Sequence, residues 1–231
     1  MTRYEFSNEF DIMFNNIMSD SAPGLTEYEK SVFLTRAQDS VIDALYNGSF
    51  ERSEELRRSL DVITVEQIED YKEIKRIKPD HFHHTLFNLR DNARYIVFEA
   101  AQYDDPDACN DGEWVQVIPE RLDDLHRDLK NPFRGPSLNR VLRLDSPQIE
   151  LVSKYRIGKY LYKYIREPYP IILEPLEDGL SIGGLTKPLF YNVHEGEEIP
   201  TDGEVCELND IVHDKILFQA VALAKQAYAS A

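Results

Sequence analysis

Apolar residues near the N-terminus recur at the spacing of an α-helix. Between positions 4 and 18 they fall every third or fourth residue and form one helical face made by Phe6, Phe10, Met13, Phe14 and Ile17. Further along, Thr26 and Glu29 form a capping box, in which each side chain accepts a hydrogen bond from the other residue's backbone N–H. The apolar residues behind this box predict a long helix that ends in the turn at Asn47-Gly48.

The helical pattern continues more weakly and then returns near the C-terminus. A shorter helix is predicted from Ser53, and residues 66–78 are compatible with a helix that runs until Pro79. At the far end Asn209 or Asp210 is the predicted cap of a closing helix. The apolar face of that helix is formed by Ile211, Val212, Ile216, Ala220, Val221 and Ala224.

Between these helices apolar residues recur at every second position, which is typical of β-strands. Two strands flank Asp91-Asn92 and are predicted to form a hairpin. Pro119 is predicted to open a short helix that runs to about Leu129, since proline is favoured at the first helical position. The predicted strands cover residues 85–89, 94–103, 114–118, 140–144, 148–153 and 159–165.

This grouping predicts an α+β protein, in which N- and C-terminal helices form a helical bundle that carries a mostly antiparallel β insertion. Residues 1–78 are the predicted helical part, and the C-terminal helix completes it. Residues 79–206 form the predicted β-rich region with its loops. Residues 207–231 are the closing helix, which is expected to pack on the N-terminal helices.

Composition narrows the class of protein. Hydrophobic residues make up 42% of the chain and charged residues 29%, as in a globular protein that buries a core. No apolar run approaches the roughly 20 residues that span a bilayer, so no membrane contact is expected. Acidic residues in the opening MTRYEFSNEFDIMF stand where an export signal is basic. The two cysteines lack a CxxC spacing, which fits free thiols in a reducing compartment.

The formal net charge of −16 is unevenly distributed. Residues 121–166 hold eleven Lys and Arg against five Asp and Glu, so the remainder of the chain carries a net −22. The acidic whole argues against a sequence-independent nucleic-acid binder, because such proteins neutralise phosphates with Lys and Arg. A basic middle between acidic ends can bind copies of itself, although ordinary solvation of the surface also produces uneven charge.

No stretch completes a catalytic or metal-binding motif. His81 and His83 would face the same way on a strand and could share a zinc ion, but the spacing supplies no third ligand. The acidic loop 104–113 has no Glu at the twelfth position that a calcium loop requires. The glycines of 179–184 are not followed by the Lys-Ser/Thr pair of a phosphate loop. We therefore expect no catalysis, no cofactor and no bound metal.

Aromatic and basic residues are interleaved from position 154 to position 166. On a strand, Tyr160, Tyr162 and Tyr164 share one face, while Lys159 and Lys163 share the other. A stretch of this kind can stack on single-stranded nucleic acid. The acidic whole favours ordinary packing or a protein interface instead.

The same strand runs into prolines, which cannot extend a sheet ladder. Pro168, Pro170 and Pro175 follow Ile165 closely and predict a stiff, extended segment. Two interpretations stay open for it. It is an arm that reaches a neighbouring subunit, or it is a loop that covers the core of its own subunit.

Several stretches taken together resemble one family of virus proteins. They are LTEYEKSVFLTRAQDSVIDALYNG at 25–48, FERSEELRRSLDVI after it, NPFRGPSLNRVLRL at 131–144, YIREPYPIILEPL at 164–176 and the closing ELNDIVHDKILFQAVALAKQAY. In this order they are similar to the head-to-tail connector proteins of crAss-like, short-tailed bacteriophages. These are the small ring or adaptor proteins near the portal.

The resemblance implies a structural virion protein that is not an enzyme. It implies a homo-oligomeric ring, expected to be a dodecamer, that is assembled in the host cytoplasm. The ring would dock on the portal protein at the portal–tail junction and join other tail ring proteins, while genomic DNA passes through its bore without specific binding. Residues expected at the subunit interface are Lys159, Lys163, Arg166, Pro168 and Pro170.

Two other functions were weighed from the residues. One is a metal-dependent hydrolase that uses His81 and His83, and the other is a cellular scaffold or adaptor protein that works as a monomer or dimer. Metal content would separate the hydrolase from the rest, and neighbouring genes would separate a phage connector from a cellular scaffold.

Overall fold

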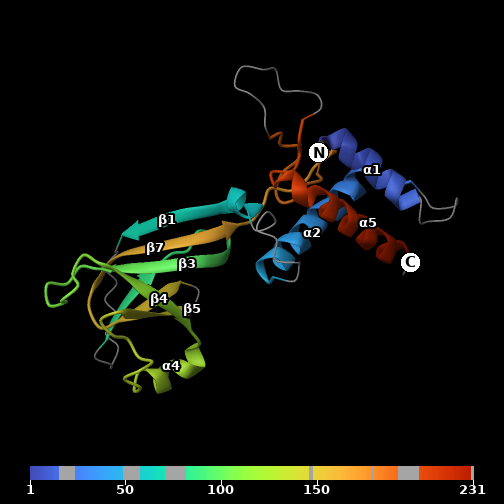
Figure 1. The fold of residues 1–231 in the computed structure, drawn as a ribbon. Helices are drawn as coiled ribbons and strands as arrows, with labels where there is room; N and C mark the ends of the chain where they lie inside the picture. Colours follow the sequence, from blue (N-terminus) through green and yellow to red (C-terminus); the bar gives the residue numbers. More distant parts are fainter. Residues whose placement is uncertain are drawn as a thin grey trace, which may run out of the picture. The chain divides into compact units, whose positions relative to one another are not determined.

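The computed structural model describes residues 1–15, 24–48, 58–70, 82–145, 148–177, 179–191 and 203–229. The chain divides into two compact units, each of which is considered by itself. A helical unit combines the two ends of the chain, Met1–Ile63 and Pro168–Ala231, and a β unit is formed by the continuous stretch Thr64–Glu167. The helical unit therefore contains both the blue and the red ends of the ribbon in Figure 1.

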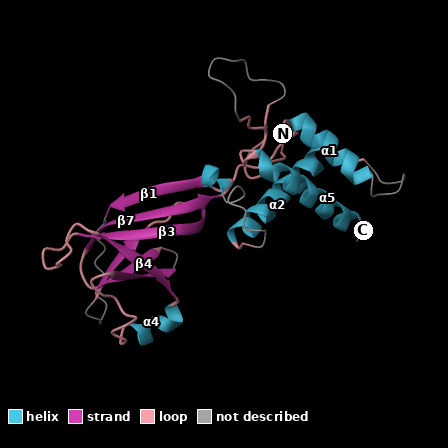
Figure 2. Ribbon diagram, viewed as in Figure 1, coloured by secondary structure: helices cyan, strands magenta, loops and turns pink. Residues whose placement is uncertain are grey.

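Among the described residues, three α-helices form the framework of the helical unit (Figure 2): α1 (Arg3–Asn15), α2 (Glu27–Tyr46) and α5 (His213–Ala229). Two short 3₁₀ turns, η1 (Asp61–Ile63) and η2 (Asp210–Val212), accompany them. The predicted aromatic face of α1 is confirmed, since Phe6, Phe10 and Phe14 are buried. Burial of this face against α2 and α5 stabilises a helix that is too short to persist alone.

The predicted capping box at the start of α2 is confirmed. The Thr26 hydroxyl accepts from the Glu29 N–H at 3.3 Å, and the Glu29 carboxylate accepts from the Thr26 N–H at 2.9 Å. These bonds lower the pKa of Glu29, chiefly through the backbone donor of Thr26. The predicted helix at the C-terminus is also confirmed, but Asn209 caps it without a side-chain hydrogen bond.

A buried ammonium group joins α1 to α2. The Lys30 Nζ donates to Asp11 at 2.6 Å, to Glu27 at 2.9 Å and to the Ser7 hydroxyl at 3.0 Å, while only 3% of its side chain is exposed. Burial by itself lowers the pKa of Lys30, but the two carboxylates outweigh burial and raise it. The charged form of Lys30 is therefore the form that the fold stabilises.

The described residues of the β unit form one seven-stranded sheet in the order β1-β7-β3-β4-β5-β6-β2. Each strand pair is antiparallel except β4 with β5, which is parallel. Figure 1 shows β1, β7 and β3 side by side. The strands are β1 (Thr64–Asp70), β2 (His83–Phe87), β3 (Ala93–Tyr103), β4 (Trp114–Glu120), β5 (Arg140–Asp145), β6 (Ile149–Ser153) and β7 (Ile157–Arg166).

The sheet has an aromatic core on one side of β7. Tyr160, Tyr162 and Tyr164 are buried there, with neighbouring rings 5.2 and 5.5 Å apart, and Phe87 packs on Tyr160. We call this side the inner sheet face. A second apolar cluster, around Leu142, Leu144 and Val152, is covered by side chains of α4 (Leu122–Asp128) and the residue that follows it.

The prediction that a bundle of terminal helices forms the main body of the fold is wrong, although the mostly antiparallel β region between those helices roughly agrees with the prediction. A seven-stranded sheet dominates the fold, and the helices at the two ends of the chain accompany it in a mixed α+β architecture. The error has a local cause. The pattern of residues 66–78 is compatible with a helix, but residues 66–70 belong to β1, which pairs along its whole length with β7, from Thr64 opposite Ile165 to Asp70 opposite Lys159. Residues 71–78 lie outside the described residues.

Two smaller predictions in the β unit are also wrong. The strands that flank Asp91 do not form a hairpin: β2 pairs with β6, and β3 pairs with β4 and β7. Pro119 does not open a helix, because it lies in β4 opposite Arg143 of β5. Both errors arise because strand partners are chosen by distant residues and not by the local turn. The predicted helix from Ser53 falls largely outside the described residues.

Within the described residues, no helix has the length and apolar character required to cross a membrane.

Candidate subunit interface

The five residues predicted at an interface lie in both units. Lys159 and Lys163 are on β7, and Arg166 is its last residue, so these three belong to the β unit. Pro168 and Pro170 belong to the helical unit. The place of these five residues at an interface stays a prediction.

Lys159 and Lys163 lie on the side of β7 opposite the tyrosines, which we call the outer sheet face. The register places Glu66, Ile68 and Asp70 of β1 beside Lys163, Leu161 and Lys159 of β7. Phe98 of β3 lies opposite Lys163, and Gln102 lies opposite both Lys159 of β7 and Trp114 of β4. The outer sheet face of these four strands thus combines charged and apolar side chains.

Three large apolar side chains are exposed on the outer sheet face. Ile68 and Phe98 are each 50% exposed, and Trp114 is 43% exposed. A sheet that faces water on one side ordinarily carries polar residues there. Large apolar side chains gathered on one face are typical of a surface that binds another protein.

The charges on the outer sheet face are partly paired within the subunit. The Lys163 Nζ lies 2.7 Å from a Glu66 carboxylate oxygen, and both side chains are about half exposed. Lys159 is exposed and forms no ion pair within the described residues. Lys159 is therefore the cation of this face that is available to an acidic partner.

The tyrosines of β7 are not available for stacking on nucleic-acid bases. Tyr160 and Tyr162 have no exposed surface, and Tyr164 is 4% exposed. The Tyr160 hydroxyl donates to Glu99 at 2.8 Å, and Glu99 also accepts from Arg143. Burial, with the Glu99 charge as the next cause, raises the pKa of Tyr160 and keeps its hydroxyl protonated. These rings are packing residues of the inner sheet face.

The proline-containing segment packs on its own helical unit as far as Leu173. The backbone N–H of Ile171 donates to the Thr35 hydroxyl at 3.2 Å, and that of Leu173 donates to the Ser31 hydroxyl at 3.0 Å. The side chains of Ile171, Ile172 and Leu173 are at most 1% exposed, and Pro170 is buried. The covering interpretation therefore describes residues 170–173, since their side chains form part of the core of the helical unit.

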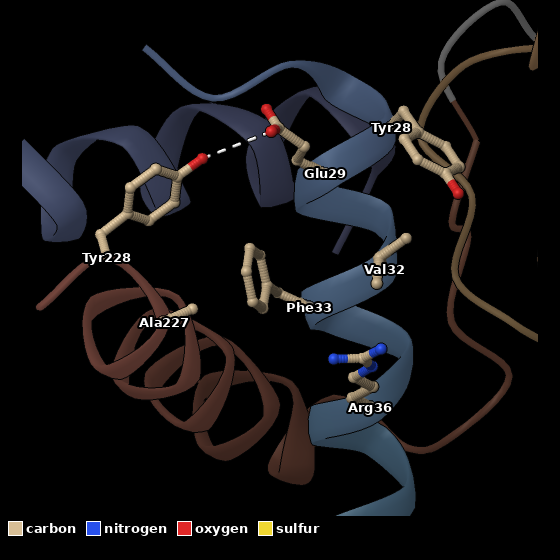
Figure 3. Close-up of a pocket in the computed structure, with 7 residues that line it drawn as sticks. All are labelled: Tyr28, Glu29, Val32, Phe33, Arg36, Ala227 and Tyr228. Atoms are coloured by element: carbon tan, nitrogen blue, oxygen red, sulfur yellow. Dashed lines mark hydrogen bonds between the residues drawn. The ribbon is translucent and has the colours of Figure 1, made fainter. Parts of the chain in front are cut away.

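The helical unit also carries an apolar groove between α2 and α5, shown in Figure 3. It encloses about 290 Å³, and Phe33 of α2 and Tyr228 of α5 project toward it from opposite sides. The Tyr228 hydroxyl donates to Glu29 at 3.3 Å across one end, as the dashed line marks. The lining residues of this α2–α5 groove are Tyr28, Glu29, Val32, Phe33, Arg36, Ala227 and Tyr228.

The histidines predicted as possible zinc ligands are not assembled into a site by the described residues. His81 lies outside them, and His83 is exposed at the start of β2. His84 instead approaches Glu150 of β6 at 2.7 Å, with both side chains nearly buried. The described part of the chain contains no group of three His, Cys, Asp or Glu residues with the geometry of a metal site.

The two units differ strongly in net charge. The stretches that make up the helical unit hold 9 Lys and Arg against 23 Asp and Glu, a net −14. The β unit holds 17 against 19, a net −2. The acidic character of the whole chain is therefore concentrated in the helical unit.

Comparison with known proteins gives the family. A model of the phage tail ring protein 3/4 family matches residues 1–231. The chain belongs to this family. Ring protein 3 of Bacteroides phage crAss001 is 41% identical over 234 residues, which cover 97% of this chain and 95% of that protein. Ring protein 4/5 of the same phage is 33% identical over 242 residues, which cover 97% and 92%.

Membership of the tail ring family confirms the resemblance to crAss-like phage connectors. It makes the chain a structural phage ring protein, and it directs attention to surfaces that bind other proteins. Sequence reasoning found Lys159 and Lys163 but missed Ile68, Phe98 and Trp114. Ile68 was missed because its segment was read as a helix. The sequence signal that could have indicated an exposed apolar face was the alternation of side chains between the two faces of β3 and β7.

Proposed function

We propose that the protein is a subunit of a closed ring of identical copies at the portal–tail junction of a crAss-like phage. The observation that supports this most directly is the match of the ring-protein family over the whole chain. The proposed ring is a dodecamer that docks on the portal protein and joins further tail rings. It has no catalytic role and lies in the virion.

A closed ring requires two different surfaces on each subunit, because each copy contacts the next one head to tail. The outer sheet face and the α2–α5 groove are unlike surfaces that lie in different units. The first carries exposed Ile68, Phe98 and Trp114, and the second is a hollow between two helices. Their presence supports assembly by unlike contacts over a symmetric dimer.

The charge of the chain supports a role as a conduit for DNA. A net charge of −16 gives little attraction for phosphate groups. In a ring whose bore is lined by the acidic helical unit, the genome would pass without binding. This part of the proposal predicts that the purified protein does not retain duplex DNA even at low salt.

The experiment that tests the proposal is a mass measurement in solution, alone and with the portal protein of the same phage. A species of about twelve subunits, formed alone or on the portal, is the expected result. Replacing Phe98 by Asp should prevent that species while leaving the thermal unfolding midpoint nearly unchanged, because Phe98 is half exposed. A protein that stays monomeric with the portal would contradict the proposal and favour a scaffold that works as a monomer.

A further inference from the structure

One aromatic side chain in the β unit is held out into solvent by an ordered loop. Phe133, in the loop after α4, is 85% exposed, more than any other large apolar side chain among the described residues. Its backbone N–H donates to the Asn131 side chain at 2.9 Å, and its carbonyl accepts from Arg140. Gly135 N–H closes the turn onto the Asn131 carbonyl at 2.8 Å.

The remainder of the loop is also fixed to the sheet. The Tyr103 hydroxyl donates to the Ser137 carbonyl at 3.0 Å, and the Asn110 amide donates to the Leu138 carbonyl at 2.9 Å. Gly135 is packed so closely that an added Cβ would lie 2.9 Å from the Asp128 carbonyl oxygen. A side chain presented by an ordered loop loses little entropy when it binds. Exposed aromatic residues of this kind are the residues that anchor protein interfaces.

The loop is basic, whereas the unit that contains the groove is acidic. Residues 129–144 hold four Lys and Arg and no Asp or Glu, and Lys130 and Arg134 flank Phe133 as exposed side chains. The helical unit carries a net −14. At the edge of the α2–α5 groove, the Glu29 carboxylate is held by Thr26 and Tyr228, and its pKa is lowered, so it is ionised at neutral pH.

We infer that Phe133 of one subunit inserts into the α2–α5 groove of the next copy in the ring, with Arg134 beside Glu29. This inference rests on the proposed ring. The groove offers an aromatic wall from Phe33 and Tyr228, against which a third ring can pack. The groove is lined by one acid, Glu29, and one base, Arg36, and it lies in the acidic helical unit. The partner is a second copy of this chain because the exposed ring with its basic loop and the groove of the acidic unit are all present in it, on different units.

The test uses thiol cross-linking between two proteins that each carry one introduced cysteine. Both carry Cys109→Ser, since Cys109 is the exposed native thiol and Cys206 is buried. One protein also carries Arg134→Cys, at the exposed position next to Phe133, so that the Phe133 ring is kept. The other carries Ala227→Cys, a change at an exposed position in the groove lining. After mixing, assembly and treatment with a short bismaleimide, a dimer that contains one chain of each kind is expected. Such a product can only form between copies.

The matched control replaces Ala227→Cys by Phe218→Cys. Phe218 is 68% exposed on the same helix, nine residues away and therefore on the opposite side of α5. We expect at least a tenfold lower yield of the mixed dimer with this control. Phe133→Ala should in addition reduce the fraction of subunits in rings at least tenfold, while Phe218→Ala should leave that fraction unchanged.

The outcomes separate the inference from the function on which it rests. Rings that form without the cross-link between positions 134 and 227, or that link position 134 equally to position 218, overturn the inference but leave the proposed ring unaffected. A second result would also overturn the inference. If rings stay intact with Phe133→Ala, and if Ala227→Trp, which fills the groove, abolishes portal binding, the groove binds another tail protein. If the unsubstituted protein forms no ring, the proposed function itself fails. A thermal unfolding midpoint for each variant identifies any that do not fold.

Discussion

Lys163 and Glu66 face each other across β7 and β1, with the Lys163 ammonium 2.7 Å from the Glu66 carboxylate. The pair neutralises one cation of the outer sheet face inside the subunit. Lys159, four residue pairs along the same ladder and opposite Asp70, remains exposed. The two lysines on one face of β7 are therefore not equivalent, and this difference can be tested.

We expect Lys159→Glu to reduce ring assembly more than Lys163→Glu. Reversal at Lys159 removes a cation that is available to a neighbouring subunit, whereas Lys163 is already paired. Neither change should alter the free energy of unfolding by more than about 1 kcal/mol, because exposed ion pairs contribute little. The measurement is the fraction of subunits in rings at matched concentration and ionic strength.

The double variant Lys163→Glu with Glu66→Lys is the control for this prediction. It restores the pair in reverse and should assemble like the unsubstituted protein. Raised salt should weaken assembly of the unsubstituted ring more than that of Lys159→Glu, because screening acts on the charges at the contact. Equal and complete assembly of all variants would show that the charges on this face do not contribute to ring assembly.

A second prediction concerns Lys30, the buried ammonium between α1 and α2. Lys30→Met leaves Asp11 and Glu27 without their common partner, and we expect it to lower the free energy of unfolding by about 2 kcal/mol. Chemical denaturation monitored by circular dichroism measures this loss. Lys225→Met, on the partly exposed side of α5, is the control and should have a small effect.

The same lysine makes stability depend on alkaline pH. Because the pKa of Lys30 is raised in the folded protein above its ordinary 10.5, its stabilisation is present below that value and is lost as pH rises through the folded pKa. The unsubstituted protein should therefore lose more stability above pH 10.5 than Lys30→Met does. If the free energy of unfolding of the two proteins falls equally with pH in that range, the loss does not come from Lys30.

Acidic pH should destabilise the helical unit through His213. The ring is buried, with Nε2 2.8 Å from the Leu208 carbonyl oxygen, and burial is the main cause that lowers its pKa below 6.5. The neutral form is the folded form, so this stabilisation is present above pH 6.5 and is lost as pH falls through the folded pKa. Between pH 7 and pH 5 the thermal midpoint should fall further for the unsubstituted protein than for His213→Gln.

This comparison separates the effect of His213 protonation on stability from that of the carboxylates, because the carboxylates titrate in both proteins. Gln at position 213 retains an N–H donor for the Leu208 carbonyl but does not take up a proton. A fall of equal size in both proteins would show that the carboxylates alone produce the acid sensitivity.

The two cysteines should differ sharply in reactivity. Cys109 is exposed, whereas Cys206 is buried, and burial raises the pKa of Cys206 to about 12. Because the thiolate is the reactive form, a maleimide at pH 7 should label one thiol per folded chain and two after denaturation. Mass spectrometry counts the labels, and Cys109→Ser should show none in the folded state. Rapid labelling of two thiols in the folded chain would contradict the burial of Cys206.

The sequence by itself determined the elements whose signals are local. The capping box of Thr26 and Glu29 fixes the start of α2, because the partners lie three residues apart and close on each other. The aromatic stripe on α1 and the apolar face of α5 follow from the helical period. The tyrosine face of β7 follows from the strand period. The family resemblance rested on stretches that include α2 and α5.

Only the tertiary structure decided the pairing of the strands and the surfaces that result. Residues 66–70 are compatible with a helix locally, and they become part of β1 because β7, almost a hundred residues later, supplies the hydrogen bonds of the whole strand. That choice places Ile68 on the same exposed sheet face as Phe98 and Lys159. The exposure of Phe133 and the hollow between α2 and α5 likewise arise from contacts between distant segments, which no local pattern records.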